Sequence, residues 1–221
     1  KNNLVITNSL YEANDIYNRL LNYTDKVLFF PMDDFITSEV TDISPEFVID
    51  RLTTLNKLLG NGKYIVVTNL MGILRYLPST KLYKNKIIDI NKDMDIDRDD
   101  FINKLFDLGY EKVPVVSRTG EMAIRGYVID IFPIEFDNPI RIEFWGDTID
   151  SIKYFDLEDQ ISNTSVDSVK IYPYTEFLID GKIEDNITRK QKYLLNYSDS
   201  VSGLWDYASD SVIFYYDYNQ I

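Results

Sequence analysis

Hydrophobic and polar positions along the first part of the chain follow two alternating periods. Apolar runs of four or five residues occur at 4–7, 27–30 and 64–68, and each is typical of a buried strand. Between these runs, apolar residues recur every three to four positions, which predicts helices at about 10–20 and 45–58. The third run is followed by a further short helical stretch that ends near Pro78. This order of strands and helices predicts a parallel α/β layer.

Beyond residue 86 the order of elements changes. A helix is predicted at 101–108, where Asp97 can cap its start and Gly109 ends it. The chain then contains more strands than helices, so this part is interpreted as a separate α+β unit. Outside the stretch considered next, its strands are predicted at 87–90, 113–116 and 169–172.

The stretch 120–156 is rich in Ile, Val, Phe and Tyr and is interrupted by turn-forming residues. It predicts three consecutive strands joined by tight turns, an antiparallel meander. In the middle strand, apolar residues alternate with Arg141, Glu143 and Trp145, so one face is apolar and the other carries a cation, an anion and an indole. Two interpretations remain open. Either Trp145 marks a partner surface, or it folds over an edge of the sheet while Arg141 pairs with Glu143 or a neighbouring strand.

The last part of the chain is polar from about residue 174. It contains a helical stretch near 188–196 and an apolar run at 211–216 that predicts one more buried strand. The simplest layout has three parts, in which the last part returns to the first domain and adds its strand there. These parts are a first α/β domain at 1–88, an inserted α+β domain at 89–173 and a return segment at 174–221.

Composition narrows the functions open to this chain. Its 221 residues carry a formal net charge of −13, which argues against a chain that grips nucleic acid by itself. It has no Cys and no His, which excludes disulfides, thiolate or imidazole metal sites and catalysis by a His base. No apolar run approaches the roughly 20 residues of a membrane span, and we expect a cytoplasmic protein. Because the sequence opens at Lys1 without an initiator Met, we expect a piece of a longer protein.

One acidic motif resembles a calcium loop without completing it. Asp93, Asp95 and Asp97 have the spacing of the first three loop ligands. The sixth and twelfth positions of such a loop require Gly and Glu, and here they hold Arg98 and Lys104. We therefore interpret these acids as helix-capping and solvated residues.

The sequence also lacks the motifs that bind nucleotide phosphates. Neither GxxxxGK[ST] nor a GxGxxG after a strand occurs, so we expect no nucleotide binding, no catalysis and no cofactor or metal in this chain. The pair Asp33 and Asp34 carries little information in a chain with 36 acidic residues. The segment 217–220 follows a strand at the place where helicase-type domains keep a Mg²⁺-organising acidic box. Without a phosphate loop, we interpret it as structural or vestigial.

The densest motifs of the chain resemble a known family region. They are GEMAIRG at 120–126, IDIFP at 129–133, RIEF at 141–144 and DTIDSI at 147–152. Together they resemble the UvrB-homology region of bacterial repair proteins. Two families share this region, the excinuclease subunit UvrB and the transcription-repair coupling factors.

Three features make the chain more similar to the coupling factors. UvrB carries a phosphate loop in its first domain, which is missing here. UvrB also inserts a long Tyr-rich hairpin after its second strand, whereas this chain has only residues 32–43 in that gap. Finally, the segments SPE at 44–46 and LRYLP at 74–78 resemble the first domain of the coupling factors. Tyr127 departs from the pattern, since many relatives have a small residue there.

The resemblance implies an α/β fold like that of UvrB, with a partial parallel helicase-like domain and an inserted α+β domain built on an antiparallel sheet. It implies a non-catalytic module that binds UvrA, the damage sensor of nucleotide excision repair. The contact surface in the family uses two arginines and an aromatic residue, which fall on Arg125, Arg141 and Trp145. The face of Arg125 depends on whether Gly126 makes a bulge.

The resemblance also has implications for the parent protein, an ATP-dependent DNA translocase. This region is expected to pack against the translocase part and hold it inactive until RNA polymerase engages. ATP, Mg²⁺, DNA and RNA polymerase would then be bound outside this region. Two alternatives stay open: a structural clamp without direct UvrA binding, and an enzyme or UvrB fragment that handles nucleotide or DNA, which measurable ATP binding would support.

Overall fold

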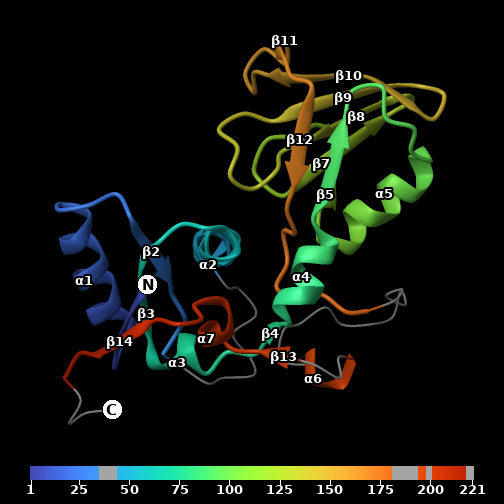
Figure 1. Cartoon of the computed structure of the whole chain (residues 1–221). Coiled ribbons are helices and arrows are strands. Elements are labelled where there is room, and N and C mark those ends of the chain that lie inside the picture. The colour runs from blue at the N-terminus through green and yellow to red at the C-terminus, as the bar shows by residue number, and fades with distance from the viewer. Residues whose placement is uncertain (35–43, 181–193, 198–200, 218–221) are drawn as a thin grey trace. The chain divides into compact units, whose positions relative to one another are not determined.

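The computed structural model describes residues 1–34, 44–180, 194–197 and 201–217. It shows a mixed α/β chain with both parallel and antiparallel sheets (Figure 1). The chain divides into two compact units, each described separately below. We call them the α/β unit, Lys1–Lys84 with Asp185–Ile221, and the α+β unit, Asn85–Glu184. The inserted domain was predicted at 89–173.

The α/β unit is built on a parallel sheet with the strand order β14-β1-β3-β2. The predicted apolar runs form these strands. The return segment adds β14 beside β1, and the side chains of β14 are exposed, whereas a buried strand was predicted. The reason is that α1 and α2 pack on β2, the other edge strand, whereas the main neighbour of β14 is β1. The bounds are β1 Asn3–Thr7, β2 Val27–Phe30, β3 Ile65–Asn69 and β14 Val212–Tyr215.

Helices flank this sheet, with α1 and α2 on opposite sides of it in Figure 1. Helix α1, Leu10–Leu21, packs its apolar side on Val5, Val27, Phe29 and Val67. At its start, Ser9 and Glu12 form a reciprocal capping box. Helix α2 spans Pro45–Leu58 and begins with Pro45, a residue that suits the first position of a helix.

Short elements complete the α/β unit. The predicted short helix ends earlier than expected, since α3 covers Leu70–Ile73 and Pro78 lies in a strand. That strand, β4 (Leu77–Pro78), pairs antiparallel with β13 (Val201–Ser202). Residues 188–193 of the predicted late helical stretch lie outside the described residues. The remaining helices are α4 Thr80–Lys86, α6 Leu194–Tyr197 and α7 Leu204–Tyr207.

The α+β unit is built on a six-stranded sheet with the order β11-β10-β9-β8-β7-β6. All neighbours are antiparallel except β6 and β7. The prediction of three strands in 120–156 was wrong, because this stretch holds four. Gly126 has φ +59° and forms a hairpin turn between β7 and β8. The bounds are β6 Glu111–Lys112, β7 Glu121–Arg125, β8 Val128–Ile131, β9 Ile140–Trp145, β10 Thr148–Phe155 and β11 Ser162–Ser165.

The strand predicted at 113–116 is also wrong. The structure places the short β6 just before it, and residues 113–116 have no regular structure. Pro114 explains the difference, because proline has no N–H to donate to a strand ladder. A separate antiparallel pair is formed by β5 (Ile88–Asn91) and β12 (Ser168–Ile171), close to the predicted positions.

Helix α5, Arg98–Asp107, and the β5–β12 pair cover one face of the six-stranded sheet. Asp97 accepts a hydrogen bond from the backbone N of Asp100 at 2.7 Å, which confirms it as the predicted cap. Gly109 follows the helix with φ +90°, a conformation that favours glycine. The core between helix and sheet contains Phe101, Leu105, Met122, Ile129, Ile131, Ile140, Ile142, Phe144, Ile149 and Ile152.

Candidate functional site

The candidate site lies on the face of the six-stranded sheet opposite α5. Strand register places Asp130 of β8 directly opposite Arg141 of β9, and Val128 opposite Glu143. On the other side of β8, Arg125 of β7 lies opposite Val128. Directly paired residues share a face of an antiparallel sheet. Three neighbouring strands therefore bring two cations and two anions to one face, while the alternate residues of β9 are buried in the core.

Among the described residues of this unit, Trp145 is the most exposed large hydrophobic side chain, with 83% of its surface accessible. It ends β9, and Gly146 follows with φ +64° in the turn to β10. The interpretation in which this indole folds over an edge of the sheet is therefore wrong. Tyr127, which is also exposed, lies in the turn between β7 and β8, and its carbonyl accepts a hydrogen bond from the backbone N of Phe144. Two turns at the same end of the sheet thus carry exposed aromatic residues.

Arg141 is engaged by the chain itself. Its Nε donates to Asp130 Oδ1 at 2.8 Å and its Nη2 to Asp130 Oδ2 at 3.0 Å, a bidentate pair. The hydrogen bond with Asp130 raises the pKa of the Arg141 guanidinium above its ordinary value. The interpretation that Arg141 pairs with a neighbouring strand is thus confirmed, although the side chain of Glu143 has other partners.

Glu143 pairs with the strand on the opposite side of β9. Lys153 Nζ of β10 lies 2.7 Å from Glu143 Oε2, and the Ser151 hydroxyl donates to the same oxygen. These two hydrogen bonds, that from Lys153 first, lower the pKa of the Glu143 carboxyl below its ordinary value. The two anions of the site therefore have different partners: Asp130 pairs with Arg141, and Glu143 pairs with Lys153.

Arg125 shares the face of Arg141, because its Nη2 also donates to Asp130 Oδ2. Gly126 makes a turn and no bulge, which settles the orientation that the sequence left open. Arg125 keeps 46% of its side chain exposed, compared with 16% for Arg141. A shallow hollow of about 350 Å³ is lined by Arg125, Val128, Arg141, Glu143 and Gln160.

Asp130, which joins the two arginines, was not predicted as a site residue from the sequence. Only 1% of the Asp130 side chain is exposed. A signal was present, since an acid interrupts the otherwise apolar run 128–132, on the face opposite Ile129 and Ile131. The pattern did not show which cation this acid would meet.

The other acidic motifs have local roles where the structure describes them. Asp95 Oδ1 accepts a hydrogen bond from the Thr148 hydroxyl, Asp97 caps α5, and Asp93 lies in a turn with φ +63°. Within the described ranges, no group of three or more acidic side chains is placed to hold a metal ion. Of the segment 217–220, residues 218–220 lie outside the described part of the chain.

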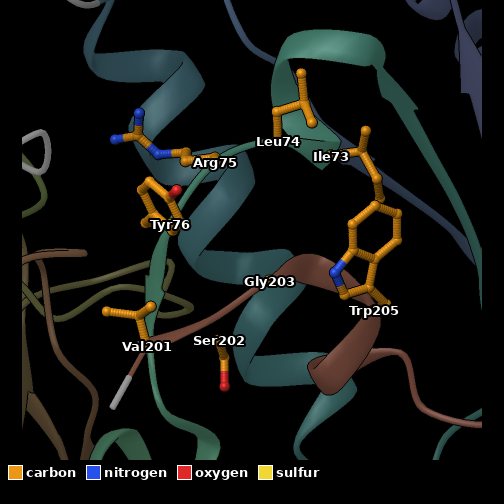
Figure 2. Close-up of a pocket in the computed structure, with 8 residues that line it drawn as sticks. All are labelled: Ile73, Leu74, Arg75, Tyr76, Val201, Ser202, Gly203 and Trp205. Atoms are coloured by element: carbon orange, nitrogen blue, oxygen red, sulfur yellow. The ribbon is translucent and has the colours of Figure 1, made fainter. Parts of the chain in front are cut away.

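A second hollow, of about 280 Å³, lies within the α/β unit (Figure 2). Ile73 and Trp205 line one side of it and Tyr76 and Val201 the other. Its lining is mostly apolar and does not define a ligand chemistry. The charged face of the α+β unit is therefore the stronger candidate.

The part of the chain that carries this face is similar to a known domain family. Residues 88–177 match the family described as the UvrB interaction domain, and this stretch contains every strand of the six-stranded sheet. Among the described residues, no helix is long and apolar enough to cross a membrane.

Over most of its length, the chain is also similar to transcription-repair-coupling factors. It is 35% identical over 194 residues to the factor from Staphylococcus haemolyticus, which covers 87% of this chain and 16% of that protein. The factor from Staphylococcus epidermidis is 34% identical over 200 residues, 90% of this chain and 17% of its own length. For Staphylococcus aureus, the identity is 35% over 191 residues, 86% of this chain and 16% of the relative. The resemblance predicted from the motifs is confirmed, and the chain spans about a sixth of these relatives.

Proposed function

We propose that this chain is a non-catalytic recruitment module of transcription-coupled nucleotide excision repair, and that its antiparallel sheet binds UvrA. The match to the UvrB interaction domain and the similarity to coupling factors support this role. Arg125, Arg141 and Trp145 are proposed as the contact site. The observation that carries the proposal is Trp145, an exposed indole beside a half-exposed arginine on a charged face.

The physical character of this face suits a protein partner. Trp and Arg are enriched among the residues that dominate interface energies, where truncation costs roughly 2 kcal/mol or more. Glu143 and Asp130 offset the cations around them, so the face is not a uniformly basic stripe of the kind that binds nucleic acid. An acidic group of UvrA is the proposed ligand of Arg125, with Trp145 supplying apolar contact area.

The α/β unit is proposed to be a helicase-like layer without nucleotide chemistry. In phosphate-binding folds, backbone N–H groups at the start of a helix hold the anion. At the start of α1, the carboxylate of Asp34 accepts from the backbone N of Leu10 at 2.9 Å and 3.0 Å. The Ser9–Glu12 capping box engages two further backbone N–H groups. These internal contacts support the proposal that the start of α1 does not bind a nucleotide phosphate.

The test is a calorimetric titration of the 221-residue chain with purified UvrA. Saturable binding is expected, and Trp145→Ala and Arg125→Ala should each weaken it at least about tenfold, or about 1.4 kcal/mol. Tyr11→Ala is the matched control, because Tyr11 is 82% exposed but lies on α1 of the α/β unit. No saturable binding, or an equal loss with Tyr11→Ala, would overturn the proposed role.

The remaining proposals concern the parent protein. We propose that the same region contacts the translocase part and limits its activity, while RNA polymerase and DNA are bound elsewhere in the parent. The buried Asp130–Arg141 pair favours one alternative, a structural clamp that does not contact UvrA. That alternative predicts that Trp145→Ala changes the ATPase activity of the parent and leaves its affinity for UvrA unchanged.

A further inference from the structure

Asp130 occupies the centre of the candidate site, with almost none of its side chain exposed. Its two carboxylate oxygens accept hydrogen bonds from both arginines, Oδ1 from Arg141 and Oδ2 from Arg141 and Arg125. One buried carboxylate thus links side chains from β7 and β9 through β8. The planar guanidinium of Arg141 matches this geometry, which a lysine ammonium would not reproduce.

The Arg141 guanidinium also contacts residues other than Asp130. Its Nη1 donates to the carbonyl of Gln160 at 3.1 Å and to the Ser162 hydroxyl at 3.3 Å. Its guanidinium carbon lies 4.6 Å from the centroid of the Phe155 ring. Four of the five N–H groups of a guanidinium are therefore engaged within the chain. Arg141 joins β8 to the start of β11 and has little surface left for a partner.

Arg125 is held differently. It contributes one described bond, to Asp130, and nearly half of its side chain faces solvent at the rim of the hollow. An arginine side chain that is already oriented loses less conformational freedom when a partner binds. The buried carboxylate fixes the direction of Arg125 without covering it.

We propose that Asp130 is a positioning residue for the interaction surface. It orients Arg125 towards the partner and fixes Arg141 within the sheet. Arg125 and Trp145 then contact the partner, and Arg141 supports this surface without touching the partner. This inference rests on the proposed binding of UvrA and specifies how the same surface is built.

The binding test is a double-mutant cycle on the 221-residue chain, titrated with UvrA. Asp130→Asn keeps the shape of the side chain, removes its charge and should weaken binding roughly fivefold to tenfold. If Asp130 acts through Arg125, the same substitution should cost less than about twofold in an Arg125→Ala background. When Asp130→Asn is combined with Trp145→Ala, the losses of binding free energy from the two substitutions should be additive. Asp167→Asn, which removes an exposed acid of the same unit, is the control for net charge.

Additive losses for Asp130→Asn and Arg125→Ala would overturn the positioning role while leaving UvrA binding intact. A second readout does not depend on UvrA at all. In a chain labelled with ¹⁵N-arginine, Asp130→Asn should shift the Nε–H resonance of Arg141, speed its hydrogen exchange and increase the mobility of the Arg125 side chain. Unchanged arginine resonances would overturn the proposal even if the wild-type chain does not bind UvrA.

Discussion

The two units each place an aspartate beside groups that could otherwise bind an anion, with opposite outcomes. In the α/β unit, Asp34 is exposed and accepts hydrogen bonds from the backbone N of Leu10, at the start of α1, and from Asn69 Nδ2, at the end of β3. In the α+β unit, Asp130 is buried and accepts from two arginines, one of which remains half exposed. The Asp34 carboxylate therefore occupies the donors around it, whereas the Asp130 carboxylate leaves Arg125 available to a partner.

The contrast shows that burial decides what an internal carboxylate does. An exposed acid at a helix start replaces water and satisfies free N–H groups at modest energy. A buried acid must be paired, so it fixes the geometry of the cations that surround it. The same residue type can therefore close one potential site and organise another.

The largest expected effect is on the stability of the α+β unit. Asp130→Ala leaves Arg141 largely buried without its carboxylate and should lower the free energy of unfolding by about 3 kcal/mol. This is the lower end of the usual range, because Arg141 keeps its bonds to Gln160 and Ser162. Urea unfolding followed by circular dichroism measures the loss. A loss below about 1 kcal/mol would show that the buried Asp130 contributes no more to stability than the exposed Asp34.

A smaller loss is expected from the matching substitution in the α/β unit. Asp34→Ala returns the backbone N of Leu10 to water and should cost about 1 kcal/mol, the usual value for a lost helix cap. The same denaturation experiment measures it, and Asp33→Ala serves as the control at the adjacent position. Because the Ser9–Glu12 capping box remains, ATP should still not bind the Asp34→Ala chain. ATP binding by this variant would mean that the Asp34 carboxylate alone prevents phosphate binding at the start of α1.

The smallest expected effect is a pH dependence of stability that comes from Glu143. Because the folded-state pKa of Glu143 is lowered, its stabilising contribution is complete above the ordinary Glu value of about 4.3 and is lost as the pH falls through the lowered pKa. Both partners of the Glu143–Lys153 pair are about one third exposed, so we expect only a few tenths of a kcal/mol. Unfolding at pH 7 and at about pH 3.5 should show a slightly weaker acid dependence for Glu143→Gln than for the wild-type chain. An unchanged profile would contradict the assigned pair.

Much of this architecture could be predicted from local patterns. The strands β1, β2 and β3 are continuous apolar runs, and the alternation of β9 placed Arg141 and Trp145 together on the polar face. For two strands that were predicted wrongly, the cause was a single residue with special backbone chemistry. Pro114 ended the strand expected at 113–116, and Gly126 converted one expected strand into a hairpin.

The network within the site required the structure. An alternating pattern states which face a side chain occupies but not which residue lies opposite, because that depends on strand register. Register is what brings Asp130 next to Arg141 and Lys153 next to Glu143. The exposure of β14 was missed for a related reason, since an apolar run does not show whether helices will cover its strand.

The chain contains two tryptophans, Trp145 in the α+β unit and Trp205 in the α/β unit. Its intrinsic fluorescence therefore mixes one signal from each unit. With Trp205→Phe, the remaining indole would emit with the red-shifted spectrum of a solvated ring. A partner that covers this ring would move the emission to shorter wavelength, so the chain carries its own optical reporter at the proposed contact, with no added label.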